Sequence, residues 1–370
     1  MTNVANFSNY SLEEAHHKLG KYCRQQIHAL LLKQLTRLGE DRFTNEILQL
    51  KSVQNYLKLQ NKQLSYLKYD INAYFSCLTS WTDGANIKSF IKKELGINTN
   101  ISPTDLAFYL QRENYGCQTA ILRGKEGRIF YWHTEEENKK LVTKSLIVSL
   151  KVNNQVINCF IYPHLLPGPA FTYSQTFFIG MDELYIKNNT TKSSMANAIA
   201  WLVIMNVNHT QKIIGSLLPT FNGYAANIVQ KKHEKIYAQK YEFGGHNLEI
   251  STLQNSTKDY LFQVNLVTNQ ASKLATMNES IEKNEKEQML QRIDRTYKYI
   301  NNLDVEGTDI QILAQISQVL LTENGGNYAY KNKDVKAYIY GCLSRDGHTV
   351  RIGHPEQVKD EIINFKENSS

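Results

Sequence analysis

The hydrophobic pattern of this 370-residue chain changes its period close to residue 116. Between residues 11 and 95, apolar side chains recur at the spacing of an amphipathic helix, as at Leu19, Cys23, Ile27, Leu30 and Leu31. Ser11 followed by Glu14 has the pattern of a capping box, which starts a helix. After residue 116, short runs with strand character follow one another. A change of this kind predicts an α+β fold in which layered sheets carry helices.

Hairpins and helices can be placed along the chain from local signals. Residues 146–152 and 156–162 flank Asn153-Asn154, a strong two-residue turn signal although it lacks a glycine. A second hairpin is predicted from residues 224–229 and 236–243, and a final one from 335–343 and 349–352. Helices are predicted at residues 42–77, 87–95, 191–207, 279–302 and 309–321, with a short helix opening at Ser102-Pro103. We therefore expect two sheets covered by helices.

Gly116-Cys117 opens the first strand-like stretch. Residues 118–123 and 128–133 read as a hairpin around residues 124–127. A small residue before a cysteine that begins a hairpin is what an autoprocessing N-terminal-nucleophile enzyme needs. The thiol attacks the preceding carbonyl, and the freed α-amine, with an ordinary pKa of about 7.7 to 8.0, becomes its base. The alternative is a small buried hydrophobic side chain, the commoner role of a free cysteine on an apolar strand.

Composition excludes several other classes. The net charge of +7 is spread thinly along the chain, so nucleic-acid binding is not expected. No apolar run approaches the roughly 18 residues of a spanning helix, and residues 1–10 lack the pattern of a signal peptide. These features predict a cytoplasmic protein without membrane contact, while secretion without a signal stays open. Five scattered cysteines and the adjacent pair His16-His17 argue against disulfides and a metal site, and we expect no cofactor.

Several blocks resemble, in order, the isopenicillin N acyltransferase family of cysteine N-terminal-nucleophile hydrolases. They are residues 12–20, residues 115–119 around Gly116-Cys117, residues 133–136, residues 162–171, ending Leu-Pro-Gly-Pro-Ala-Phe, and residues 335–355, ending Gly-His-Pro. The resemblance spans roughly residues 10 to 355 and implies a four-layer αββα sandwich with a helical N-terminal segment. Cleavage between Gly116 and Cys117 would give an α fragment, 1–116, and a β fragment, 117–370, which together form one domain.

The resemblance also implies roles for individual residues. Cys117 would be the nucleophile, and Asn265 would donate a hydrogen bond to the oxyanion of the tetrahedral intermediate. Asn269 lies a few positions later and is a rival for that role. Glu135 and Glu136 would lie near the nucleophile and hold its amine or the substrate. A solvated turn over residues 135–140 is an equally good interpretation of this acidic run.

Further residues are expected near the substrate. His133 would pack or form hydrogen bonds, because the α-amine already serves as the base. Gly168 would shape the rim of the pocket, and Phe171 belongs to the same block. Arg292 and Arg295 could clamp a substrate carboxylate. More often such arginines lie on a solvated helix face, which is the interpretation we favour for this pair.

The chain departs from the family pattern at four places. Gln118 stands where a small hydroxyl residue is expected, and Thr134 stands where asparagine is expected. The histidine that flanks the oxyanion asparagine is missing beside Asn265, and Met289 replaces a serine ahead of Arg292. The alternation of side chains along a strand predicts that Thr119 faces away from Gln118 and cannot replace the missing hydroxyl. These departures put the efficiency of autoprocessing in doubt.

Three functional hypotheses follow. The first is an amidohydrolase or acyltransferase that acts on a small linear amide, or on an acyl thioester such as acyl-coenzyme A, through an acyl-enzyme on Cys117. The second is an unprocessed, non-catalytic family member that binds a ligand or partner. The third, a papain-like cysteine protease, needs a helix beginning at the cysteine, which the strand character of residues 118–123 opposes. Whether the chain forms a homo-oligomer stays open.

Overall fold

The computed structural model describes residues 3–95, 101–111, 116–138, 145–184, 193–218, 220–255, 259–268, 283–321, 333–353 and 361–366. These residues divide between two compact units. The helix-rich unit comprises Met1–Glu113, Thr143–Thr172 and Asn188–Phe221. The two-sheet unit comprises Asn114–Val142, Tyr173–Lys187 and Asn222–Ser370. Strand β6 (Phe171–Ser174) carries the chain from the first unit into the second.

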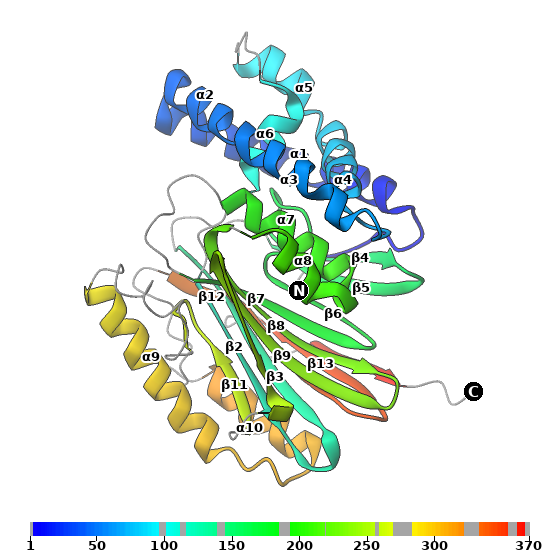
Figure 1. The fold of residues 1–370 in the computed structure, drawn as a ribbon, viewed down its shortest axis with the longest axis vertical. Coiled ribbons are helices and arrows are strands. Elements are labelled where there is room, and N and C mark those ends of the chain that lie inside the picture. Colours follow the sequence, from blue (N-terminus) through cyan, green and yellow to red (C-terminus); the bar gives the residue numbers. More distant parts are fainter. Residues whose placement is uncertain are drawn as a thin grey trace. The chain divides into compact units, whose positions relative to one another are not determined.

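The helix-rich unit is built mainly from the N-terminal part of the chain (Figure 1). Its α-helices are α1 (Leu12–Leu38), α2 (Glu40–Gln49), α3 (Lys51–Leu64), α4 (Ile71–Gly84), α5 (Ile87–Phe90), α6 (Pro103–Leu110), α7 (Ser193–Met205) and α8 (Thr210–Ser216). A π-helical turn, Ile91–Leu95, and a 3-10 turn, Val207–His209, extend them. The predicted capping box at Ser11 and Glu14 begins α1. The predicted helix over residues 42–77 is divided among α2, α3 and α4, because Asp70 caps a new helix.

Close helix packing and a hairpin organise this unit. A Cβ on Gly20 of α1 would lie 2.1 Å from the Trp81 carbonyl oxygen of α4, so only glycine allows these backbones to touch. Strand β1 (Asn3–Asn6) pairs in parallel with β4 (Leu146–Val152), which pairs in antiparallel fashion with β5 (Gln155–Ile161). Asn153 and Asn154 adopt φ angles of 49° and 64°, which confirms the predicted two-residue turn.

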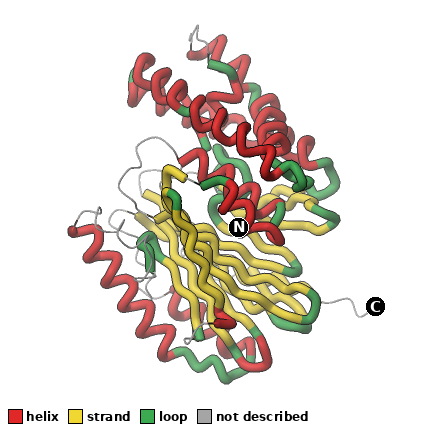
Figure 2. The backbone as a smooth tube through the Cα atoms, viewed as in Figure 1, coloured by secondary structure: helices red, strands yellow, loops and turns green. Residues whose placement is uncertain are grey.

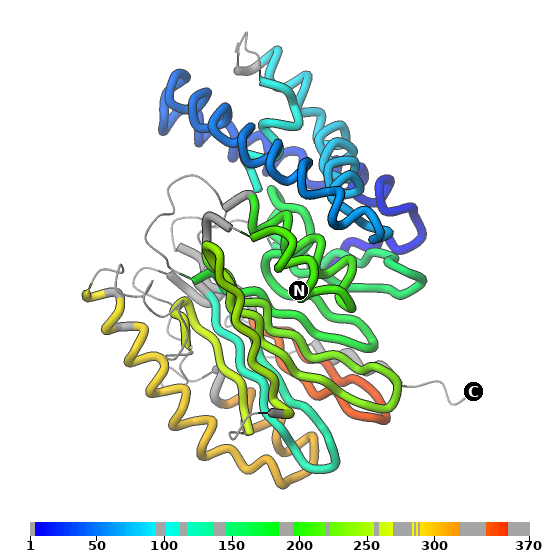
Figure 3. Tube along the Cα trace, in the orientation of Figure 1, coloured from blue at the N-terminus to red at the C-terminus, as the bar shows by residue number. Residues whose placement is uncertain are grey.

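The two-sheet unit contains the strand-rich part of the chain. One sheet has the order β11-β2-β3-β12-β13-β14, and a second set of strands has the order β7-β8-β9-β10. The bounds are β2 (Gly116–Arg123), β3 (Ile129–Asn138), β7 (Phe177–Leu184), β8 (Thr220–Lys232), β9 (Lys235–Gly245), β10 (Asn247–Thr252), β11 (Tyr260–Gln263), β12 (Lys333–Leu343), β13 (Gly347–Gly353) and β14 (Glu361–Lys366). The 3-10 turns Lys125–Gly127 and Leu253–Asn255 follow β2 and β10. Figure 3 shows β2 and β3 in the same sheet as the later β12 and β13.

Helices α9 (Lys283–Asn302) and α10 (Asp309–Leu321) cover one face of the six-stranded sheet (Figure 2). Ala120, Leu122 and Trp132 project from that face into a core with Ile293 of α9 and Ile312 of α10. On the opposite face, β2 packs against β7. The unit therefore has three layers, sheet, sheet and helices. The prediction of a mixed α+β fold with a helical N-terminal segment and two sheets is confirmed.

Candidate active site

Cys117 lies at the start of β2, where the predicted hairpin is confirmed. Its partner on β3 is Glu135, and the next pair along the same face is Thr119 with His133. Because side chains alternate along a strand, these four point together away from the helices and toward β7. All four side chains are buried, and only 4% of Cys117 is exposed. The solvated-turn interpretation of Glu135 is wrong, because β3 runs through this position.

The thiol, the imidazole and the carboxylate lie close together. One donor atom from each of Cys117, His133 and Glu135 lies within 4.8 Å of the other two. His133 Nε2 lies 2.7 Å from Glu135 Oε1, and Cys117 Sγ lies 3.4 Å from the Met181 carbonyl oxygen on β7. The site therefore joins the nucleophile candidate to a hydrogen-bonded imidazole–carboxylate pair.

A chain of hydrogen bonds continues from His133 into β7. Thr119 Oγ1 lies 2.7 Å from His133 Nδ1 and 2.6 Å from Asp182 Oδ2. Asn227 Nδ2 of β8 donates to the same Asp182 oxygen at 2.7 Å. Because Asp182 Oδ2 accepts, the single Thr119 proton goes to it, and Thr119 then accepts from His133 Nδ1–H. The remaining proton of the imidazole–carboxylate pair lies between His133 Nε2 and Glu135.

Asp182 is a carboxyl of this chain of hydrogen bonds with a strongly shifted pKa. Burial raises its pKa to about 6, while the nearby His133 ring and the Thr119 hydrogen bond act in the opposite direction. Its second oxygen, Oδ1, is buried and has no hydrogen-bond partner among the described residues. Since Oδ2 already accepts two hydrogen bonds, the proton of neutral Asp182 belongs on Oδ1. The carboxyl is thus half satisfied in a water-poor site.

Gly180 on β7 makes room for this arrangement. A Cβ at this position would lie 2.8 Å from His133 Nδ1 and 2.9 Å from Thr119 Oγ1. Any side chain would push against the two atoms that share a hydrogen bond. Glycine on β7 therefore allows β2 and β3 to bring their polar side chains against the second sheet.

Asn265 reaches Cys117 from the segment that follows β11. Its Oδ1 accepts a hydrogen bond from the Cys117 backbone N–H at 3.4 Å, and its Nδ2 donates to the Glu183 carbonyl at 2.8 Å. The resemblance assigns Nδ2 to the oxyanion; here one of its two N–H groups donates to Glu183, and the oxyanion role stays a prediction. Through Oδ1, Asn265 also positions the cysteine nitrogen. The rival Asn269 lies outside the described residues.

A buried ion pair holds the segment that carries Asn265. Lys240 Nζ lies 3.0 Å from Glu242 Oε2, and both residues project from β9. Glu242 Oε1 accepts from the Thr268 backbone N–H at 2.8 Å, and Lys240 donates to the Phe262 carbonyl at 3.3 Å. These contacts fix the chain on both sides of Asn265. Sequence reasoning missed this pair, since it joins positions on β9 to a distant loop.

Arg292 and Gln118 meet on the opposite face of β2. Arg292 Nε donates to Gln118 Oε1 at 3.1 Å, and only 4% of Arg292 is exposed. The solvated-face interpretation is therefore wrong for Arg292, while Arg295 is half-buried on the same helix. Gln118 and Thr119 point in opposite directions, as predicted. Arg292 lies in the helix layer, whereas the thiol faces the second sheet, so this contact does not bring a guanidinium to the thiol.

The remaining predicted residues fall elsewhere. Gly168 and Phe171 are buried in the helix-rich unit, where the Phe171 ring stacks on Phe160 with centroids 4.9 Å apart. Gly116 and Glu136 pair with each other through their backbones, but the Glu136 side chain lies outside the described part of the chain. Substrate binding by these residues stays a prediction.

Three residues of the site were missed from the sequence: Thr119 as a participant, Asp182 and Asn227. Asp182 had a detectable signal, since it and Glu183 interrupt an otherwise apolar run over residues 177–184, every one of which is buried. An acidic residue in such a strand needs a buried partner. Asn227 had no comparable signal, because its strand of residues 220–232 contains several polar residues.

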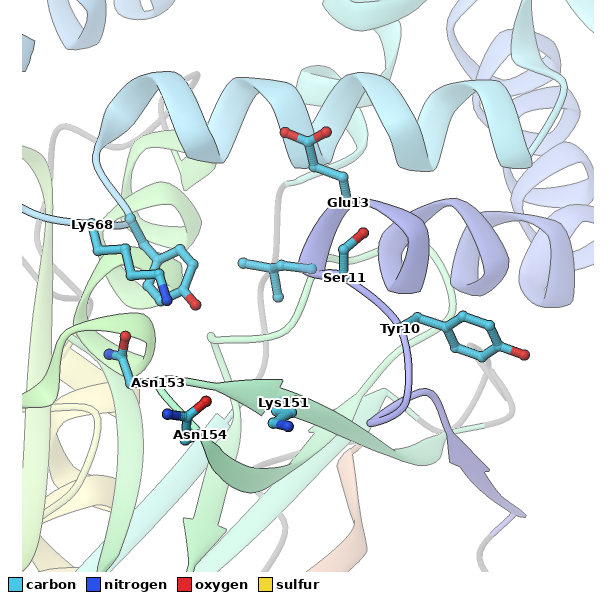
Figure 4. Close-up of a pocket in the computed structure, with 9 residues that line it drawn as sticks. Tyr10, Ser11, Glu13, Lys68, Lys151, Asn153 and Asn154 are labelled. Carbon is cyan, nitrogen blue, oxygen red and sulfur yellow. The ribbon is translucent and has the colours of Figure 1, made fainter.

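A separate cavity of about 410 Å³ lies in the helix-rich unit (Figure 4). Its lining is mixed: Leu12, Tyr10 and Tyr69 lie beside the polar residues Ser11, Glu13, Lys68, Lys151, Asn153 and Asn154. The side chains of Ser11 and Glu14 already form the capping hydrogen bonds that begin α1 there, and the two lysines are exposed. None of the residues that line this cavity was predicted to be a catalytic or substrate-binding residue.

A search with protein-family models matches none of them to this chain, and no curated protein matches it either. Among the described residues, no helix combines the length and apolar character needed to cross a membrane.

Proposed function

We propose that the chain is a cysteine N-terminal-nucleophile enzyme. It releases Cys117 from Gly116 and then hydrolyses small linear amides, or transfers their acyl groups, through an acyl-enzyme on this thiol. One observation carries the proposal: Cys117 directly follows Gly116 at the start of β2, with its nitrogen beside Asn265 and its sulfur beside the His133–Glu135 pair.

The processing step uses groups that already meet at this strand end. The Cys117 thiolate attacks the Gly116 carbonyl carbon, the bond to the Cys117 nitrogen breaks, and that nitrogen takes up a proton. Water then hydrolyses the thioester, which leaves a carboxylate on Gly116 and a free α-amine on Cys117. Asn265 Oδ1, which accepts from the Cys117 N–H at 3.4 Å, would hold the new amine.

Turnover follows the same geometry. The α-amine takes the thiol proton, the thiolate attacks the substrate carbonyl, and the leaving amine departs with that proton. Water then releases the acid, or a second amine takes the acyl group. Thr119 and Asp182 fix the tautomer and orientation of His133, which in turn holds Glu135 beside the cysteine. Both reaction outcomes use the same acyl-enzyme.

The layer order supports the fold that the resemblance implies. Within the two-sheet unit, one sheet packs on another and helices cover the outer face. We therefore propose the four-layer αββα sandwich of N-terminal-nucleophile hydrolases for the chain, with 1–116 and 117–370 as its fragments.

A second candidate function is binding without catalysis. Two groups that the reaction could use already form hydrogen bonds, since one N–H of Asn265 Nδ2 donates to Glu183 and Arg292 donates to Gln118. In that case the chain stays unprocessed and binds a ligand or partner. The two functions differ in a single observable, the integrity of the Gly116-Cys117 bond.

Intact mass and N-terminal sequencing of the purified protein test the proposal. Cys117→Ala is the test variant, and Cys342→Ala is the matched control because Cys342 is also buried in the six-stranded sheet. The wild-type and control proteins should yield two fragments, one beginning Cys117-Gln118-Thr119, while Cys117→Ala stays a single chain of 42.6 kDa. A single uncleaved chain in all three folded proteins, both as purified and after incubation with a metal chelator, would contradict the enzyme proposal and favour the binding function.

A further inference from the structure

The side chains of Cys117, His133 and Glu135 form a compact set of metal-ligand atoms. The thiol, imidazole and carboxylate donors all lie within 4.8 Å of one another. A point can then be found within about 2.8 Å of all three, and zinc bonds to these donor types are about 2.0 to 2.3 Å long. Small side-chain rotations would therefore bring all three onto one ion. The sequence shows no metal motif because the donors meet across two strands, Cys117 pairing with Glu135.

The surroundings of His133 match those of a metal-bound histidine. Such histidines use one ring nitrogen for the metal and hold the other by a hydrogen bond to an anchored polar group. Here His133 Nδ1 lies 2.7 Å from Thr119 Oγ1, which is itself anchored 2.6 Å from Asp182 Oδ2. His133 Nε2 faces Glu135 at 2.7 Å, closer than two ligands of one zinc ion would lie. A modest separation of this pair would admit the ion.

A second observation concerns charge. Glu135 and Asp182 bring two carboxyl groups into one buried cluster, and Asp182 Oδ1 finds no hydrogen-bond partner among the described residues. Buried carboxylates are stabilised by a nearby cation. A divalent ion on Glu135 would reduce their mutual repulsion and would draw the thiol proton of Cys117 into solvent.

We propose that Cys117, His133 and Glu135 bind a zinc ion that keeps the nucleophile inactive. With its thiolate on zinc, the cysteine cannot attack the Gly116 carbonyl, and removal of the ion starts processing. The zinc site follows from the arrangement of the donor atoms whatever the function of the chain, whereas the control of processing rests on the proposed function. A water molecule would complete the four-coordinate site.

Cobalt exchange into the purified full-length protein, by dialysis against excess Co²⁺ without a chelator step, tests the site directly. A Co²⁺–thiolate charge-transfer band should appear in the near ultraviolet, and Zn²⁺ should abolish it by displacement. Cys117→Ser should lose the band, while Glu135→Gln and His133→Gln should weaken Co²⁺ binding by at least about tenfold. Cys159→Ala and Cys342→Ala are controls that should keep the band, because their thiols lie outside the set. A band that survives in Cys117→Ser, or no band in wild-type protein, would overturn the site.

Cell-free synthesis in the presence of zinc, or of a zinc chelator, tests the effect on processing. The chain should stay intact with zinc and give fragments 1–116 and 117–370 with the chelator. A cysteine-dependent cobalt band without cleavage in either reaction would keep the zinc site and contradict the enzyme proposal. Equal cleavage in both reactions would show that zinc does not control processing. If the cobalt band is absent too, the zinc site is also wrong, while the enzyme proposal stands.

Discussion

The eight residues of strand β2 alternate between two faces that have different surroundings. One face carries Cys117 and Thr119 and meets β7 through polar contacts. The other carries Ala120 and Leu122 and meets α9 and α10 through an apolar core. The alternation of a strand thus places reactive groups on one side and stabilising groups on the other. Mutations on the two faces should therefore separate stability from chemistry.

Truncation of the apolar face should have the largest effect on stability. Trp132 is fully buried in the core beneath α9 and α10. Replacement of Trp132 by alanine should lower the free energy of unfolding by about 3 to 5 kcal/mol, because it removes burial and leaves a cavity. Urea denaturation measures this change. Ile310→Ala, at a position that is 73% exposed on α10, is the control and should change it by less than about 0.5 kcal/mol. Equal losses for the two variants would contradict the assignment of the core.

The stability of the fold should depend on pH through Asp182 of β7, which contacts Thr119 on the polar face of β2. Its pKa is raised to about 6 by burial, so the folded state holds the proton more tightly than the unfolded chain. Its stabilising contribution is complete below about pH 4 and is lost as the pH rises through 6. The difference corresponds to at most about 3 kcal/mol.

Asp182→Asn isolates this contribution, because an amide oxygen can still accept from Thr119 and Asn227. Wild-type protein should lose stability relative to the variant between pH 4 and 7, as measured by urea denaturation at each pH. A difference between the two proteins that does not change with pH would show that Asp182 keeps its ordinary pKa.

Gln118→Thr should have the smallest effect on stability, and it tests whether the two faces of β2 act separately. The change restores the small hydroxyl residue of the family pattern but removes the contact of Gln118 with Arg292. We expect the free energy of unfolding to fall by about 1 to 3 kcal/mol because a buried hydrogen bond to a charged group is lost, with the extent of cleavage at Gly116-Cys117 unchanged. Denaturation and intact mass give the two values. Faster cleavage would mean that residue 118 reaches the reactive face.

Local patterns in the sequence predicted correctly the elements whose structure is determined by residues that are neighbours in the chain. The helix over 309–321 has the predicted bounds, and the hairpin around Asn153-Asn154 forms as expected because two residues with positive φ can close it. Strands β10, β11 and β14 were not predicted. They are short strands at the ends of their strand orders. Strand β11 pairs with the distant β2, whereas β10 and β14 pair with β9 and β13, their neighbours in the sequence.

The candidate site was predictable only in part, for the same reason. Cys117, His133 and Glu135 lie on one hairpin, so their proximity follows from strand pairing. Asp182 and Asn227 come from the second sheet, and no local signal gives the register between two stacked sheets. Arg292 was misplaced although a signal existed: buried Met289 and Thr296 lie three and four residues away on the same helix face.

The presence of an N-terminal cysteine at residue 117 is the central claim and can be measured chemically. 2-Cyanobenzothiazole condenses with a 1,2-aminothiol and forms no stable product with an internal cysteine. After denaturation, which makes access to the buried site irrelevant, fragment 117–370 of the wild-type protein should gain one label by mass, and Cys117→Ala should gain none. Wild-type protein that stays unlabelled even after incubation with a zinc chelator, under conditions that label a peptide beginning with cysteine, would contradict the account.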